Sequence, residues 1–194
     1  MNLTIMTGIA TDRTSPVHES PFLFPPELQP SWYAIYTCAN HEKRVKEQLD
    51  RRLVESFLPL YDSVRRWKDR KVRLQIPLFP SYVFVRLARC ERSQVLQIPG
   101  VARLVGFNGC PTALEESEID ALRRVAIVSP SLRAEPHPYL DLKVGRRVRI
   151  KGGPLAGIEG ILVRRKNGDR FVISVKLIMR SVALELDALD LEPR

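Results

Sequence analysis

The chain has 194 residues, 44% of them hydrophobic and 27% charged, with a formal net charge of +9. This composition is typical of a globular protein, and no apolar run approaches the roughly 18 residues of a membrane-spanning helix, which excludes an integral helical membrane protein. Three cysteines (Cys38, Cys90 and Cys110) without CxxC spacing exclude a disulfide scaffold and argue against a cysteine-built zinc site. No signal peptide is visible, so we expect a cytoplasmic protein. The basic balance points to a polyanionic partner, with charge that serves only solubility as the alternative.

Two proline-rich stretches divide the chain. Residues 1–30 contain several prolines and no sustained hydrophobic period, and we expect a disordered leader there. Residues 129–139 contain three prolines, which disfavour helix and strand alike, and they predict a linker. The expected domains are therefore 31–128 and 140–194.

The first domain alternates strands and helices. Asn40 is the expected N-cap of its first helix. The hydrophobic patterns predict strands over 32–37, 82–87 and 102–107, a hairpin over 64–76 with its turn near 68–71, and helices after residue 40 and over 91–98 and 115–128. This order predicts an α+β domain, an antiparallel sheet with flanking helices.

The second domain is expected to be all-β. Short strands are predicted over 147–150, 160–165, 170–175 and 181–186. Asn167-Gly168 between two of them is a strong hairpin signal. Four or five short strands in so few residues predict a small barrel, joined to the first domain by the proline-rich linker.

The sequence contains no recognisable catalytic motif. The three histidines, His18, His41 and His137, are isolated, and no phosphate-binding glycine loop or metalloprotease motif is present. The glycine-dense stretch 152–160 leads into a strand instead of a helix, so no helix N-terminus could hold a phosphate there. We therefore expect a protein that is not an enzyme and that has no cofactor and no metal site.

Two basic clusters are candidates for nucleic-acid binding. Six of the nine residues from Arg65 to Arg73 are basic, and on a projecting hairpin they would suit a phosphate backbone. Trp67 among them either stacks on an unpaired base or is buried beneath the hairpin. The second cluster is a helix face made by Arg44, Gln48, Arg51 and Arg52. A solvated surface is the alternative for both clusters.

A third feature is the aromatic segment 77–85, PLFPSYVFV. Two prolines bracket Phe79 and stiffen the entry to a strand. With Tyr33 and Tyr36, these rings form either a patch for a protein partner or part of the core.

These motifs together resemble a known family. WYAIY at 32–36, HEKRV at 41–45, PLFPSYVFV at 77–85 and PGV at 99–101 resemble the N-terminal (NGN) domain of NusG-type transcription factors. The run at 144–160, VGRRVRIKGGPLAGIEG, resembles the KOW motif that opens their C-terminal barrel. The amino-acid sequences of residues 78–84 and 105–109 are most similar to those of the specialised paralogues, RfaH and the UpxY-like antiterminators.

The resemblance implies a transcription elongation and antitermination factor. Its first domain would bind the clamp helices of the largest RNA polymerase subunit through Tyr33, Phe79, Pro80, Tyr82 and Phe84, and would suppress pausing. Contacts to the non-template DNA strand would come from Arg44, Gln48, Arg51, Arg52, Arg66, Lys68 and Arg70. The KOW domain would recruit a second partner, Rho or a ribosomal protein, and the factor would act as a monomer.

One departure from RfaH concerns the second domain, which in RfaH can be a helical hairpin. Here Val172, Ile173 and Val175 favour strands throughout. The alternative function is a stand-alone KOW-type RNA-binding or ribosome-associated protein, because KOW barrels also occur in ribosomal proteins.

Overall fold

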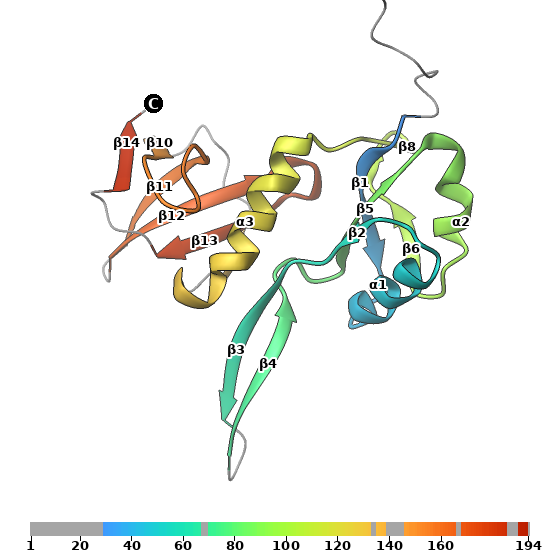
Figure 1. Ribbon diagram of the computed structural model, residues 1–194, viewed down its shortest axis with the longest axis horizontal. Coiled ribbons are helices and arrows are strands. Elements are labelled where there is room, and N and C mark those ends of the chain that lie inside the picture. Colours follow the sequence, from blue (N-terminus) through green and yellow to red (C-terminus); the bar gives the residue numbers. More distant parts are fainter. Residues whose placement is uncertain are drawn as a thin grey trace, which may run out of the picture.

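The structure, a computed structural model, describes residues 29–66, 70–132, 135–138, 146–165, 168–185 and 190–193. Figure 1 shows the arrangement of the elements. The first part of the chain, up to Leu132, contains β1 (Ser31–Thr37), α1 (Glu42–Arg51), β2 (Ser56–Phe57), β3 (Leu60–Arg66), β4 (Lys71–Pro77), β5 (Tyr82–Leu87), α2 (Arg92–Leu96), β6 (Val101–Leu104), β7 (Gly106–Phe107), β8 (Cys110–Pro111) and α3 (Glu116–Leu132). The later elements are β9 (Glu135–Pro138), β10 (Arg146–Ile150), β11 (Glu159–Arg165), β12 (Gly168–Val175), β13 (Arg180–Glu185) and β14 (Leu191–Pro193).

The first sheet has the order β2-β5-β1-β6 and is antiparallel, with Ala34 opposite Phe84. Side chains alternate across it, so Ala34 and Phe84 share one face and belong to the apolar cluster of α3. Tyr33 and Ile35 belong to the cluster on the other face, with Val45 of α1. The predicted α+β class, an antiparallel sheet with flanking helices, is confirmed.

Helix α1 packs on the sheet through a narrow apolar stripe. Val45 and Leu49, four residues apart, are fully buried. The helix begins at Glu42 after the N-cap His41, so the expected capping role of Asn40 is wrong. Asn40 instead adopts a φ of 60°, a left-handed conformation that asparagine tolerates better than most residues.

The second sheet has the order β14-β10-β11-β12-β13-β9, with every pair antiparallel. Its strands confirm the four predicted for the second domain, and Val172, Ile173 and Val175 all lie in β12. Asn167 lies outside the described residues, but Arg165 and Gly168 pair on either side of it, as the predicted hairpin requires.

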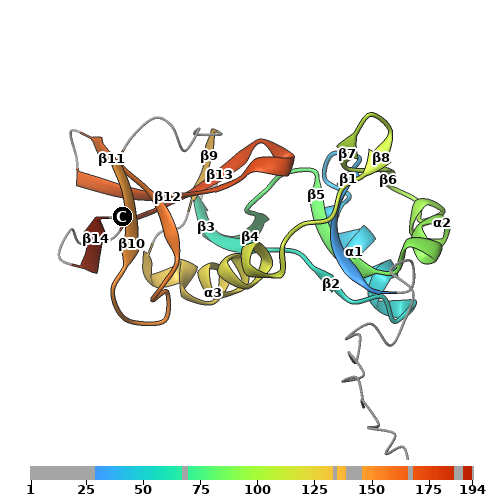
Figure 2. The ribbon, with the colours of Figure 1, turned by 90° about the horizontal axis from the view of Figure 1, so that it is seen from above.

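Helix α3 lies between the two sheets (Figure 2). It contacts β1 and β3 of the first part and β13 of the second. Arg124 donates a hydrogen bond of 2.9 Å to the carbonyl oxygen of Ala156, in the loop between β10 and β11. One cluster of buried apolar side chains accordingly runs from Trp32 through Leu122 to Val148.

The expected linker at 129–139 is wrong as secondary structure. Helix α3 continues to Leu132, and Glu135–Pro138 forms β9, which pairs with β13. Proline removes one backbone donor, so Pro130 cannot bond to the carbonyl oxygen four residues before it, and α3 ends two residues later. Because β9 is an edge strand, its prolines do not interrupt a second ladder.

Two features are absent from the described residues. No helix there is long and apolar enough to cross a membrane. The same residues contain no group of three or more His, Cys, Asp or Glu side chains that could hold a metal ion.

Replacing Thr37 by valine is expected to raise the free energy of unfolding by about 1 kcal/mol. Thr37 is 1% exposed, and its Oγ1 has no hydrogen-bond partner within the part of the chain that the structure describes, although its backbone N–H donates to Ser81 O at 2.9 Å. Valine removes the unsatisfied hydroxyl and keeps the branched shape. Urea denaturation measures the change, and Thr37→Ser, which keeps the hydroxyl and loses the methyl, is expected to destabilise. A lower midpoint for Thr37→Val would contradict the assignment.

Candidate functional site

Two tyrosines form an aromatic pair at one end of the first sheet. Tyr36 of β1 lies directly opposite Tyr82 of β5, and their ring centroids are 5.4 Å apart in an edge-to-face arrangement. Tyr36 is 37% exposed, and the Arg103 guanidinium lies 5.5 Å from its ring centroid. Tyr82 also packs against the core, so the tyrosine pair is partly exposed aromatic surface at its edge.

The five side chains expected to form an apolar pocket do not share one surface. Tyr33 points to the α1 face of the sheet, where its hydroxyl accepts a hydrogen bond of 3.1 Å from Arg92 Nη2. Phe79 and Phe84 lie on the opposite face but are only 1% and 0% exposed. Among the five, Pro80 is exposed and Tyr82 partly so. The alternation of β1 separates Tyr33 from the others.

Residues 79–82 form a tight turn that leads into β5, here named the Phe79–Tyr82 turn. Its ends are joined by a hydrogen bond of 3.1 Å from Tyr82 N to Phe79 O, and Ser81 has a φ of 67°. Proline at the second position and a positive φ at the third are the features of a type II turn. The buried carboxylate of Glu42, on α1, accepts a hydrogen bond of 2.7 Å from Ser81 N.

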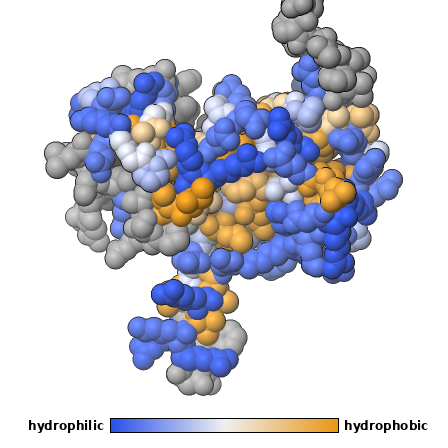
Figure 3. Space-filling model, in the orientation of Figure 1, coloured by the Kyte–Doolittle hydropathy of each residue, from blue (hydrophilic) through white to orange (hydrophobic). Residues whose placement is uncertain are grey.

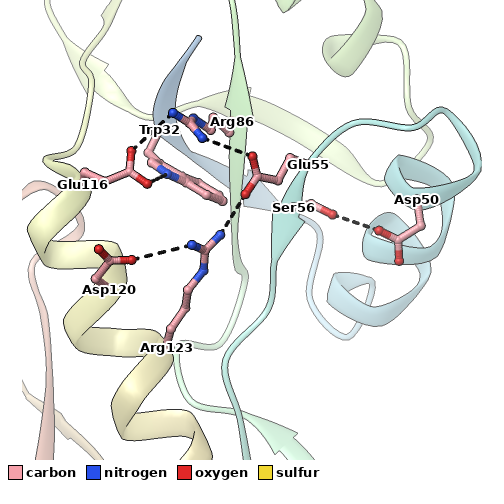
Figure 4. Close-up of polar contacts among 8 residues, drawn as sticks. All are labelled: Trp32, Asp50, Glu55, Ser56, Arg86, Glu116, Asp120 and Arg123. Carbon is pink, nitrogen blue, oxygen red and sulfur yellow. Dashed lines mark hydrogen bonds and ion pairs between the residues drawn. The ribbon is translucent and has the colours of Figure 1, made fainter. Parts of the chain in front are cut away.

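A polar network joins α3 to the first sheet (Figure 4). Trp32 Nε1 donates to Glu116 Oε1 at 3.0 Å, and Arg123 Nη2 pairs with Glu55 Oε1 at 2.9 Å. Arg86 lies between the two carboxylates, 3.5 Å from Glu55 Oε2 and 3.7 Å from Glu116 Oε2. The Arg123 guanidinium also lies 4.9 Å from the centroid of a Trp32 ring. This network fixes the side of α3 that faces the sheet.

The start of α3 carries a carboxyl group whose pKa is shifted by its surroundings. Burial raises the pKa of Glu118, and a hydrogen bond from the backbone of Glu115, at 3.3 Å, partly offsets the rise. Glu118 thus closes the first turn of α3 and takes no part in the surfaces above.

The β3–β4 hairpin projects away from both sheets (Figure 1). Arg66 lies directly opposite Lys71, and Arg73 is opposite Val64 on the same face. Arg66, Lys71 and Arg73 are all exposed. Like charges placed directly opposite one another destabilise a hairpin, so this basic hairpin face costs folding energy. Arg70 is also exposed, whereas Trp67 and Lys68 lie outside the described residues.

The predicted basic face of α1 is present, but two of its arginines already have partners within the protein. Arg44 and Arg51 are exposed, and Gln48 is partly buried between them. Arg51 Nη2 pairs with Glu47 Oε1 at 2.6 Å, and Arg52 Nη1 donates to Gln94 O at 2.7 Å. Figure 1 shows α1 and the hairpin as two separate groups.

The surface in Figure 3 agrees with this description of the hairpin. On the projecting hairpin, hydrophilic side chains (blue) and apolar ones (orange) form alternating patches. In β4 the exposed positions Lys71, Arg73 and Gln75 alternate with the partly buried Val72 and Leu74. The basic face is therefore the face turned to solvent.

The sequence-based site omitted residues that the structure brings to these surfaces. The predicted pocket omits Tyr36, although the aromatic patch includes it. Lys71 and Arg73 belong to the predicted basic cluster, but the family resemblance implies DNA contacts only for Arg66, Lys68 and Arg70 within it. Their signal was the period-two alternation, which assigns Tyr36 and Tyr33 to opposite faces and Arg73 and Lys71 to the same one. Glu42 had no local signal, because its partner is 39 residues away.

Comparison with known proteins agrees with the fold and the motifs. A family model described as "Transcription termination factor nusG" matches residues 30–123. A "Transcription termination/antitermination protein NusG" of Lactococcus lactis is 30% identical over 185 residues, which cover 83% of this chain and 91% of that protein. The protein of the same name from Rickettsia felis is 26% identical, over 80% of this chain and 86% of its own.

A solved structure gives the same fold. The structure titled "Domain interaction in Thermotoga maritima NusG" superposes with a TM-score of 0.53 at 21% identity, over 86% of this chain and 98% of that one. Together with the matches in sequence, this likeness leads to one assignment. The chain belongs to the NusG family and is a NusG-type transcription termination/antitermination factor, not an enzyme.

Proposed function

We propose that the chain binds the clamp helices of the largest RNA polymerase subunit through Tyr36, Tyr82 and Pro80. The observation that carries this proposal is the partly exposed tyrosine pair beside a turn held in one conformation. Aromatic side chains are typical anchors of protein interfaces, and a fixed backbone lowers the entropy lost on binding. Phe79 and Phe84 support this surface from beneath.

Binding there suppresses pausing by a population shift. A factor that binds the closed clamp more tightly than the open clamp lowers the occupancy of the open, paused state. The size of this shift is set by the difference between its affinities for the closed and the open clamp. The hairpin and α1 then reach the displaced non-template DNA strand. The basic hairpin face supports this role, because a cost in folding energy is offset when a polyanion binds.

Residues 31–128 bind the polymerase, and residues 140–194 recruit a further partner, Rho or a ribosomal protein. We propose that the factor is one of the specialised RfaH and UpxY-like paralogues, because of the amino-acid sequences of residues 78–84 and 105–109. The exposed Arg44 and the partly exposed Gln48 support that placement, because their side chains can read base edges. A specialised factor prefers one non-template sequence over scrambled strands of equal length.

The test is binding of the purified full chain to core RNA polymerase, followed by single-round transcription. We expect a complex at micromolar concentrations or below and a shorter dwell time at pause sites. A chain that forms no complex and leaves pausing unchanged contradicts the proposal.

The second candidate function is RNA binding without polymerase. Arg146 and Arg147 of β10 are both exposed, which favours a polyanionic ligand at the second sheet. Affinity for naked RNA that falls steeply with salt, in the absence of any polymerase complex, would support this function instead.

A further inference from the structure

Glu42 is buried although it is the first residue of α1. Its side chain is 5% exposed, in a position where a carboxylate is costly unless it is hydrogen-bonded. Ser81 N–H supplies such a bond, at 2.7 Å from Oε1. A charge-assisted bond of this kind is stronger than one between neutral groups. The contact therefore fixes the Ser81 peptide against the N-terminus of α1.

The peptide that Glu42 holds is strained. Ser81 has a φ of 67°, in the left-handed region that residues other than glycine rarely adopt. Serine has no intrinsic preference for this region, so the conformation depends on its surroundings. The bond to Glu42 orients the Ser81 N–H inward and favours this conformation over those that point it elsewhere.

We propose that Glu42 is a positioning residue for partner binding. By holding Ser81 it keeps the Phe79–Tyr82 turn formed in the free protein, with Pro80 and Tyr82 already placed for contact. The inference rests on the proposed function, because it assigns Glu42 to the same polymerase-binding surface. If the turn is formed in only a fraction of molecules, the apparent Kd rises by the reciprocal of that fraction.

The first experiment measures the Kd of the full chain for core RNA polymerase. Glu42→Ala is expected to bind about tenfold more weakly, as the loss of one hydrogen bond to a charged group predicts. Glu42→Gln keeps an acceptor oxygen and is expected to stay within about twofold of the wild type. Val95→Ala, a substitution at a buried position of α2, controls for destabilisation and is expected to leave the Kd unchanged.

Two further measurements separate positioning from general stability. Amide exchange at Ser81 is expected to accelerate in Glu42→Ala relative to the amides of β1. Ser81→Gly removes the cost of the positive φ. Combined with Glu42→Ala, it is expected to restore the affinity to within about threefold of the wild type.

The outcomes distinguish this inference from the proposed function. A wild-type chain that does not bind polymerase overturns both. A wild-type chain that binds, with an unchanged Kd in Glu42→Ala or with the same loss in Val95→Ala, overturns the positioning role alone. Loss in Glu42→Ala with recovery through Glu42→Gln and Ser81→Gly supports it.

Discussion

Replacing Tyr36 and Tyr82 together by alanine is expected to weaken the binding of RNA polymerase by at least about 100-fold. Each aromatic anchor at an interface contributes about 2 kcal/mol or more, and the two rings here contact each other, so their effects need not add. Tyr36 is 37% exposed and Tyr82 is only partly buried, so most of the core survives the substitution. The Kd for core polymerase measures the loss, and circular dichroism checks the fold.

Two controls give this experiment its meaning. Phe107→Ala removes a ring that is 64% exposed, on the β7–β8 hairpin, and is expected to leave the affinity unchanged. Tyr33→Phe removes only the hydroxyl bonded to Arg92, on the other face of the sheet, and is also expected to bind normally. Wild-type affinity in the double tyrosine variant, or an equal loss in Phe107→Ala, contradicts the assigned surface.

Phe79 is a poor choice for such a test. It is 1% exposed and packs edge-to-face against Phe84, with ring centroids 5.9 Å apart. Removing a buried phenyl ring costs about 3–5 kcal/mol of folding free energy. A loss of binding in Phe79→Ala would therefore report unfolding as much as a missing contact.

Local patterns predict many of the strands, but the strand predicted over 102–107 is two strands, β6 and β7, and β9 was not predicted. In the run 72–76, apolar Val72, Leu74 and Ile76 alternate with polar Arg73 and Gln75. All five residues lie in one strand, β4. This run predicts the hairpin turn just before it, near residues 68–71, and in the structure Arg66 pairs with Lys71. Each of these inferences concerns neighbours in sequence, for which spacing is sufficient.

The site needed information that spacing does not contain. Alternation places Tyr33 and Tyr36 on opposite faces of β1, but only the register with β5 decides which of them meets Tyr82. The bond between Glu42 and Ser81 likewise depends on how α1 packs against the sheet. Such long-range contacts follow from tertiary packing and leave no local signal.

The three prolines of residues 129–139 led to a wrong prediction, because they indicated a linker without helix or strand. Proline disfavours helix and strand interiors, but a helix can end soon after a proline, and an edge strand can spare a backbone donor. Pro130 lies near the end of α3, and Pro136 and Pro138 lie in an edge strand. The expected break is thus a helix followed by a strand of the second sheet.

Replacing Arg66, Lys71 and Arg73 by glutamine is expected to weaken binding of single-stranded DNA about 100-fold at 0.1 M salt. Each phosphate contact to a single strand contributes about 0.7 to the slope of log K against log salt, so losing three makes the slope shallower by about 2. The like-charge pair of Arg66 and Lys71 also disappears, so the thermal midpoint is expected to rise or stay the same. Fluorescence anisotropy over a salt series measures the slope.

A matched variant separates this basic hairpin face from net charge alone. Arg89, Lys176 and Arg180 are exposed and lie outside β3 and β4, and replacing all three by glutamine gives the same drop, from +9 to +6. If long-range attraction to the whole molecule dominated, both triple variants would lose affinity equally. We expect the slope to change by less than about 1 in this control, because phosphate contacts act within a Debye length of about 10 Å. Equal losses would mean that the opposed cations of the hairpin are not a DNA contact, and their cost to folding would then have no compensating ligand.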